Sequence, residues 1–132
     1  MLVLFVCGAN VGRSQVAEAY FNHYARRHKA VSAAAQFKGD TKISPTFKLM
    51  LEKEGVATAG QKPKPLTPDM VEEADRIIVL CSRTECPVYL LKSNKADFWS
   101  VRDVGAAGTE DRERVAAEIK ENVMRLIEEL GD

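Results

Sequence analysis

The sequence lacks a net charge, a long hydrophobic run and a large number of cysteines, and each absence excludes a class of protein. Its 19 Lys and Arg residues balance 19 Asp and Glu residues, so broad electrostatic attraction to nucleic acid or to a membrane surface is not expected. No apolar run reaches the roughly 20 residues of a membrane-spanning helix, and no stretch has the pattern of a signal peptide. Three cysteines do not make the disulfide framework of a secreted domain. We therefore expect a soluble cytoplasmic protein whose cysteines serve chemistry.

The apolar residues alternate between strand and helix patterns, and neither a repeat nor a low-complexity segment divides the chain. Strands are expected for the apolar run that begins at Leu2 and for residues 30–34, 77–80 and 96–101. Helices are expected for residues 14–27, 44–54, 67–74 and 109–130. This alternation predicts an α/β fold: one three-layer domain over residues 1–132, with a parallel sheet covered by helices on both faces.

Local signals indicate where the helices begin. Ser14 and Thr109 are interpreted as N-cap residues, and Ser44-Pro45 and Thr67-Pro68 each join an N-cap residue to a proline at the first helical position. The lysine- and proline-rich residues 61–66 are interpreted as a solvated connector.

Two histidines fall near the end of the first expected helix. We interpret His23 and His28 as solvated surface residues without a catalytic role, because neither lies near the chemistry-bearing loop described next.

The stretch between the first strand and the first helix carries a cysteine, two glycines and an arginine. It reads Cys7-Gly8-Ala9-Asn10-Val11-Gly12-Arg13-Ser14. In this context the loop N–H groups converge and the helix N-terminus adds its positive dipole end, which predicts an oxyanion site. Arg13 can bind two oxyanion oxygens, and the positive field should stabilise a thiolate at Cys7. The glycine pattern is not the Gly-x-x-x-x-Gly-Lys of a nucleotide P-loop.

Each of these residues has an ordinary structural explanation when it is taken alone. Cys7 could be a small apolar residue at a strand end, and Arg13 could be a surface charge. Their combination at a strand-to-helix junction favours a nucleophilic sulfur that attacks a tetrahedral oxyanion such as phosphate or arsenate.

Three chemically active side chains follow the C-terminal ends of expected strands. They are Cys7, Cys81 and Asp103. Ligands of open α/β sheets bind beyond these strand ends, where the strand order reverses. We therefore expect a thiolate, a second thiol and a carboxylate to meet at one edge of the sheet.

The pattern Cys7-x-x-Asn10-x-x-Arg13-Ser14 resembles the catalytic loop of the low-molecular-weight protein tyrosine phosphatase superfamily, which includes the thioredoxin-coupled arsenate reductases. The segments Trp99-x-Val101-x-Asp103 and Gly108-Thr109-Glu110 extend the resemblance along essentially the whole chain. It implies a four-stranded parallel sheet in the order 2-1-3-4. It also implies oxyanion binding by the loop residues Gly8, Ala9, Asn10, Val11, Gly12, Arg13 and Ser14.

The resemblance implies one of two chemistries. In the phosphatases, the cysteine attacks phosphotyrosine and an aspartate protonates the leaving group; Cys7 and Asp103 match these roles. In the reductases, the cysteine bonds to arsenic, a second cysteine displaces arsenite and a third resolves the disulfide. Cys81 and Cys86 match the second and third cysteines, and a thioredoxin-like protein would be the reductant.

Several residues favour arsenate reduction over phosphomonoester hydrolysis, and we expect the enzyme to be a monomer. Gln15 stands where phosphatases usually carry proline, and residues 104–106 offer no aromatic wall for a phosphotyrosine ring. The loop from Cys81 to Cys86 is short enough for the two α-carbons to approach to about 5.5 Å if it bends back. A low-molecular-weight protein tyrosine phosphatase that hydrolyses phosphomonoesters is the alternative.

A third hypothesis is a phosphate-binding or redox-sensing module without turnover. Binding alone does not require a thiolate together with an acid, so Cys7, Arg13 and Asp103 argue against it.

The resemblance also implies supporting roles. Asn10 would brace the loop, and Ser14 would hydrogen-bond the Cys7 thiolate. Some reductases hold a potassium ion near residues that match Asn10, Glu18 and Ser32; apart from this weak site, no metal and no cofactor are expected.

Overall fold

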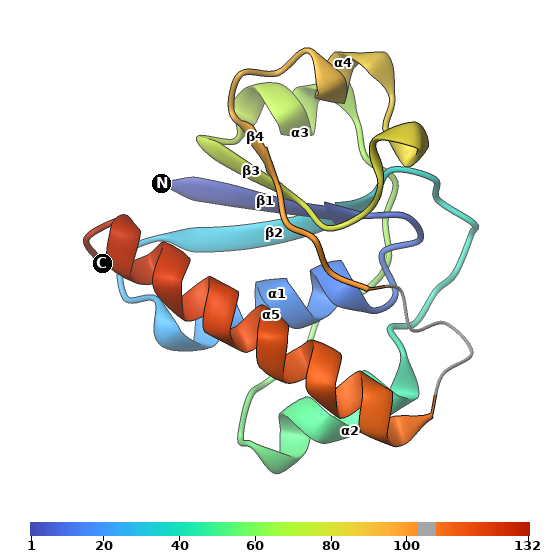
Figure 1. Ribbon diagram of the computed structural model, residues 1–132, viewed down its shortest axis with the longest axis vertical. Coiled ribbons are helices and arrows are strands. Elements are labelled where there is room, and N and C mark those ends of the chain that lie inside the picture. The colour runs from blue at the N-terminus through green and yellow to red at the C-terminus, as the bar shows by residue number, and fades with distance from the viewer. Residues whose placement is uncertain (103–107) are drawn as a thin grey trace.

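The computed structural model describes residues 1–102 and 108–132, and its sheet confirms the expected α/β topology (Figure 1). The strands β1 (Leu2–Cys7), β2 (Lys29–Ala34), β3 (Arg76–Val79) and β4 (Ala96–Phe98) lie in the order β2-β1-β3-β4. All three pairings are parallel. The predicted order 2-1-3-4 is therefore confirmed.

Strand β1 is the centre of the domain. Its residues from Val3 to Val6 are completely buried, which explains the uninterrupted apolar run, because a parallel strand with neighbours on both sides and helices on both faces meets no water. Phe5 packs against Phe21 of helix α1 (Arg13–Tyr24) and against Trp99, with ring centroids 6.0 and 5.9 Å apart. These aromatic contacts join the first strand to the segment that follows the last one.

The remaining helices cover the two faces of the sheet (Figure 1). Helices α1 and α5 (Thr109–Glu129) lie on one face and contact each other along their length, with α2 (Pro45–Lys53) beside them. Helices α3 (Pro68–Glu73) and α4 (Val88–Leu91) lie on the other face. The 3₁₀ turn η1 (Arg83–Glu85) and α4 were not predicted, since such short elements leave no periodic pattern.

Two of the four expected N-caps are confirmed and two are wrong by one or two residues. Ser44 Oγ accepts from the N–H of Phe47 at 3.5 Å, and Thr67 Oγ1 accepts from the N–H of Met70 at 3.3 Å. Helix α1 is instead capped by Gly12, without a side-chain bond, because the Ser14 hydroxyl is used inside the site described below. Helix α5 begins at Thr109, with Gly108 as its N-cap residue.

Residues 61–66 are not the solvated connector that their composition suggests. Ala34 at the end of β2 donates its N–H to the carbonyl of Lys64 at 2.8 Å and accepts from the N–H of Leu66 at 2.8 Å. This short parallel bridge fixes the segment against the C-terminal edge of the sheet. The pairing is non-local, so no local sequence signal could have revealed it.

The two histidines lie away from the C-terminal edge of the sheet. His23 is an exposed residue of α1, as expected, but His28 lies beyond the end of the helix and its Nδ1 is 2.9 Å from the N-terminal amine. The expected helix 14–27 is therefore too long by three residues, because α1 ends at Tyr24.

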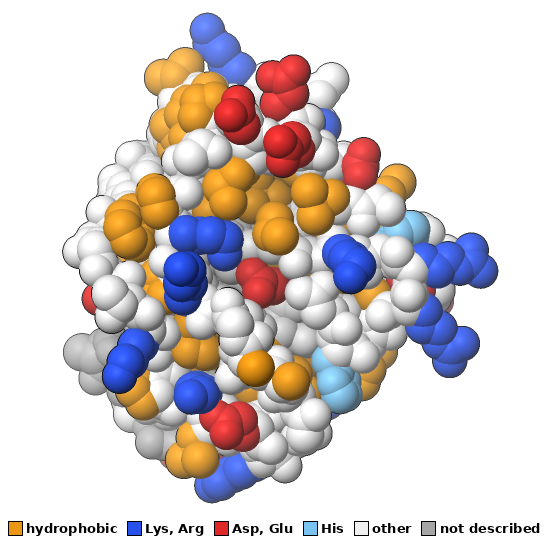
Figure 2. Space-filling view, turned by 180° about the vertical axis from the view of Figure 1, so that it is seen from behind, with side chains coloured by type: hydrophobic (Ala, Val, Ile, Leu, Met, Phe, Trp, Pro, Cys, Tyr) orange, Lys and Arg blue, Asp and Glu red, His pale blue; other side chains and the backbone are white. Residues whose placement is uncertain are grey.

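In the view from behind, acidic side chains gather mainly at the top, basic side chains are spread over the rest of this face, and apolar side chains lie between them (Figure 2). Among the described residues, no helix is both long enough and apolar enough to cross a membrane.

Candidate active site

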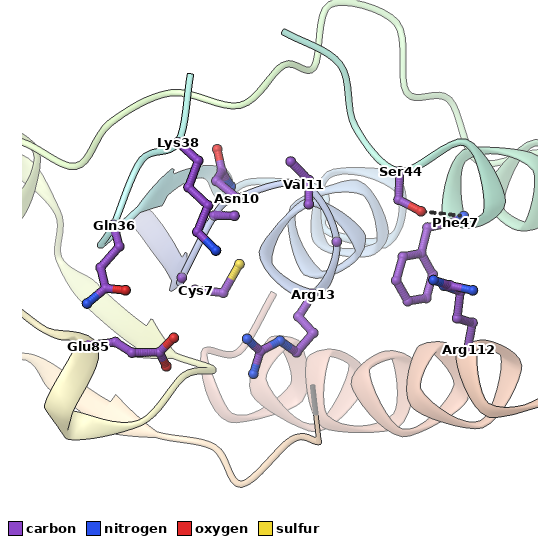
Figure 3. A pocket seen from close by; sticks show the side chains of 13 residues that line it. Cys7, Asn10, Val11, Arg13, Gln36, Lys38, Ser44, Phe47, Glu85 and Arg112 are labelled. Atoms are coloured by element: carbon purple, nitrogen blue, oxygen red, sulfur yellow. Dashed lines mark hydrogen bonds between the residues drawn. The ribbon is translucent and has the colours of Figure 1, made fainter. Parts of the chain in front are cut away.

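The loop between β1 and α1 forms the floor of a cavity of about 190 Å³. Figure 3 shows the Cys7 sulfur within it, with Arg13, Lys38 and Glu85 pointing into the cavity from three different segments. The walls are completed by Gln36, Ser44, Phe47 and Arg112. The cavity thus lies at the C-terminal end of the central strand, where the topology predicts a ligand.

The backbone of this loop turns its carbonyl groups outward. Five of them accept hydrogen bonds from groups outside the loop, namely the carbonyls of Cys7, Gly8, Asn10, Val11 and Gly12. None of the N–H groups of residues 8–12 donates to another described residue. Buried N–H donors without protein partners are costly. The loop is therefore a preformed set of donors for an anion.

Two loop residues make this shape possible. Asn10 is fully buried with φ of 60°, a left-handed conformation that asparagine tolerates better than most residues. At Gly12, a Cβ atom would come within 3.1 Å of the Phe47 ring. A side chain at position 12 would thus require Phe47 to move by a few tenths of an ångström.

The Cys7 sulfur receives a hydrogen bond from a directional network. Asn10 Nδ2 donates to Ser14 Oγ at 2.6 Å, and Ser14 Oγ is 2.9 Å from Cys7 Sγ. Since Ser14 accepts from Asn10 and its hydroxyl carries one proton, that proton is available to Cys7. The contacts that the resemblance implied for Asn10 and Ser14 are present.

The network continues through residues for which the sequence predicted no contact with the loop. Gln61 Nε2 donates to Gln15 Oε1 at 2.8 Å, and Gln15 Nε2 donates to Asn10 Oδ1 at 3.0 Å. The Lys64 N–H donates to the same Asn10 oxygen at 3.1 Å. Every donor in this chain is directed toward the sulfur, an arrangement that favours negative charge there.

Arg13 is oriented by two backbone carbonyls, one directly after β3 and one in the segment that follows β4. Its Nη1 donates to the carbonyl of Leu80 at 2.6 Å and to that of Val101 at 3.2 Å. The guanidinium carries five N–H donors, so these bonds fix its plane while it lines the cavity that contains Cys7. Arg13 thus connects the loop to the ends of β3 and β4.

Cys81 and Cys86 lie on the adjacent segment, beyond the end of β3. Burial raises the pKa of the Cys81 thiol well above its usual range, and its interactions with Cys86, Glu85 and Cys7 add to the rise. Burial also raises the pKa of the Cys86 thiol, which contacts Cys81 and whose Sγ is 3.4 Å from the Ser82 carbonyl oxygen. All three thiols are free. Cys81 thus interacts with both of the other cysteines.

Asp103, expected to be the general acid, lies outside the described residues, as do residues 104–107. Its role stays a prediction. The backbone reaches this point from Val101, which is buried and whose carbonyl holds Arg13.

The expected potassium ligands are only partly compatible with the arrangement. Ser32 Oγ donates to Glu18 Oε1 at 2.7 Å, and burial raises the pKa of Glu18 while the charge of Lys64 opposes the rise. The Asn10 amide oxygen already accepts from two N–H donors. Asn10 therefore does not fit as a potassium ligand in this structure, and no step below uses such an ion.

Comparison with known proteins places the whole chain in one group. A family model described as low molecular weight phosphotyrosine protein phosphatase matches residues 2–132. A glutaredoxin arsenate reductase from Synechocystis sp. is 26% identical over 130 residues, which cover 98% of each chain. An arsenate reductase of known crystal structure from Archaeoglobus fulgidus is 32% identical, with a TM-score of 0.79 and coverage of 95% of this chain and 98% of that one. A thioredoxin-dependent arsenate reductase from Corynebacterium glutamicum is 28% identical, with a TM-score of 0.80 and coverage of 98% and 61%.

Proposed function

The chain belongs to the low molecular weight phosphotyrosine protein phosphatase family of enzymes, and within that family we propose that it is an arsenate reductase that works through three cysteines. The observation that carries the proposal is the position of Cys81 just beyond the end of β3, where it interacts with both Cys7 and Cys86 while all three thiols are free. Of the three cysteines, a phosphatase would require only Cys7. The similarity to arsenate reductases from three organisms supports the same choice.

The first step uses the loop as an oxyanion cradle. Arsenate binds to the inward N–H groups and Arg13, and the Cys7 thiolate attacks arsenic while one arsenate hydroxyl group takes a proton and leaves as water. Asp103 is our proposed proton donor. The Ser14 hydrogen bond favours the thiolate before attack and again when sulfur departs.

The second and third steps move electrons through the thiols. The Cys81 thiolate attacks the Cys7 sulfur, and the sulfur–arsenic bond breaks with its electron pair going to arsenic, which leaves as arsenite. The Cys86 thiolate then attacks the Cys81 sulfur of the Cys7–Cys81 disulfide and releases the Cys7 thiolate. The resulting Cys81–Cys86 disulfide is reduced by the dithiol of a thioredoxin-like protein, which closes the cycle.

The deciding experiment couples arsenate reduction to NADPH oxidation through thioredoxin and thioredoxin reductase. We expect arsenate-dependent NADPH consumption by the wild type and none by Cys81→Ser, while hydrolysis of p-nitrophenyl phosphate stays close to wild type in the variant. Arsenate turnover that survives Cys81→Ser would rule out this relay.

Hydrolysis of phosphomonoesters is the second candidate function, because the cradle, Cys7 and Arg13 suit phosphate equally well. In that case the wild type hydrolyses p-nitrophenyl phosphate but consumes no NADPH with arsenate. Phosphate binding without either activity would favour a module that only binds. We also propose that the enzyme is a cytoplasmic monomer that needs no cofactor, as expected from its sequence.

A further inference from the structure

Glu85 places a carboxylate inside a cavity otherwise prepared for an anion. Its Oε2 is anchored by the N–H of Ser82 at 3.0 Å and by the Ser82 hydroxyl at 3.1 Å. Its Oε1 accepts no hydrogen bond from another described residue and lies against Gly8 of the cradle. One oxygen thus holds the side chain in place and the other faces the site (Figure 3).

Gly8 and Glu85 are sterically matched. A Cβ atom at position 8 would lie 3.0 Å from Glu85 Oε1, so a larger residue there would push the carboxylate back by a few tenths of an ångström. The glycine therefore lets the carboxylate lie directly against the first residue after Cys7.

A carboxylate that faces an anion site repels a fully deprotonated anion but accepts a hydrogen bond from one that keeps a proton. Arsenate and phosphate each retain at least one O–H near neutral pH, whereas sulfate retains none. Arg13 and Lys38 in the same cavity supply the attraction that any oxyanion needs. Building on the oxyanion cradle of the proposed function, we propose that Glu85 makes the site selective for protonated tetrahedral oxyanions and against sulfate.

The inference is tested by titrating the reduced wild type with inorganic phosphate and with sulfate in a calorimeter at neutral pH. Phosphate binds at least about tenfold more tightly than sulfate. Sulfate has no proton to donate, so the Glu85 carboxylate and the sulfate oxygen that faces it both lack a hydrogen bond. In Glu85→Gln, the amide oxygen can keep the Ser82 bonds, since glutamine also suits a capping box, and its NH₂ faces the cradle as a donor. Sulfate then binds about tenfold more tightly than in the wild type, and the selectivity disappears.

Two further variants separate selectivity from general effects. Glu85→Ala removes the carboxylate without adding a donor and also loses the preference, with a smaller gain for sulfate. Glu128→Gln removes one negative charge from an exposed position near the far end of α5 and leaves both affinities as in the wild type.

Equal affinity of the wild type for the two anions, or an unchanged ratio in Glu85→Gln, overturns the role of Glu85 while leaving the cradle and the proposed arsenate chemistry intact. Failure of the wild type to bind either anion overturns the cradle, and with it both proposals.

Discussion

The two cysteine-bearing regions of the active site are built differently. In the Cys7 loop, Cys7, Asn10 and Ser14 are buried and held by the Gln61–Gln15–Asn10–Ser14 network, and five of the loop carbonyls accept hydrogen bonds from other described residues. The segment from Cys81 to Cys86 consists of a 3₁₀ turn between a strand end and a four-residue helix, with Ser82, Arg83 and Thr84 exposed. One region is shaped for binding and attack, whereas the other is a short, largely exposed turn whose hydrogen bonds are mostly within itself.

This contrast fits the division of labour in the proposed mechanism. The first nucleophile must meet a fixed tetrahedral anion, so preorganisation lowers its barrier. Cys81 must approach Cys7 and then Cys86, and the resulting disulfide must finally meet an external dithiol, which one rigid geometry cannot satisfy. The elevated pKa of Cys81 in its buried position is consistent with a thiol that reacts only after moving.

The largest expected effect comes from the rigid region. Cys7→Ser removes the nucleophile, and we expect arsenate reduction and p-nitrophenyl phosphate hydrolysis each to fall by about four orders of magnitude or more. Steady-state kinetics with both substrates measures the loss. If either activity stays at the wild-type level, that reaction does not begin at Cys7.

A smaller loss of activity is expected when the Gln61–Gln15–Asn10–Ser14 network loses its outermost residue. Gln61→Ala removes the donor to Gln15 and leaves a buried amide oxygen unpaired, at a cost of about 1–3 kcal/mol in the free energy of unfolding. We expect both activities to fall, with an altered pH profile, because the hydrogen bonds that reach Cys7 become weaker. Lys62→Ala, at the exposed neighbouring position, is the matched control. An unaltered pH profile and full activity in Gln61→Ala would show that the cradle does not depend on this network.

The smallest expected effect is the contribution of Cys81, in the second region, to the pH dependence of the free energy of unfolding. Because burial raises the pKa of Cys81 in the folded state, the unfolded thiol, which titrates near about 8.5, loses its proton first as pH rises. The contribution of the buried neutral thiol is complete below that pH and is lost progressively above it. Denaturant unfolding from pH 7 to pH 10 should therefore show a steeper loss of stability for the reduced wild type than for Cys81→Ser. Parallel curves would mean that Cys81 titrates as a solvated thiol.

The sequence predicts most of the fold because its strongest signals are local and periodic. The buried run at β1, the Ser44-Pro45 and Thr67-Pro68 caps and the apolar stripe of α5 each specify an element without reference to the rest. The short elements between Cys81 and residue 91 have no such signal, and they are the ones that were missed.

The site was predictable where a motif carries its own chemistry. Cys7, Arg13 and Ser14 lie where the loop pattern implies, although Ser14 serves the sulfur instead of capping the helix. Gln61 and Glu85 were not identifiable, because each reaches the loop through a tertiary contact between segments far apart in sequence.

The central claim is that electrons pass from Cys81 and Cys86 to arsenic bound at Cys7. Its most direct test is to mix the fully reduced wild type with one equivalent of arsenate, without any other reductant, and to map disulfides by mass spectrometry. The account predicts one arsenite and one Cys81–Cys86 disulfide per molecule of protein, with Cys7 returned to the thiol. Arsenite formation with Cys81 and Cys86 still reduced, or no arsenite at all, would contradict it.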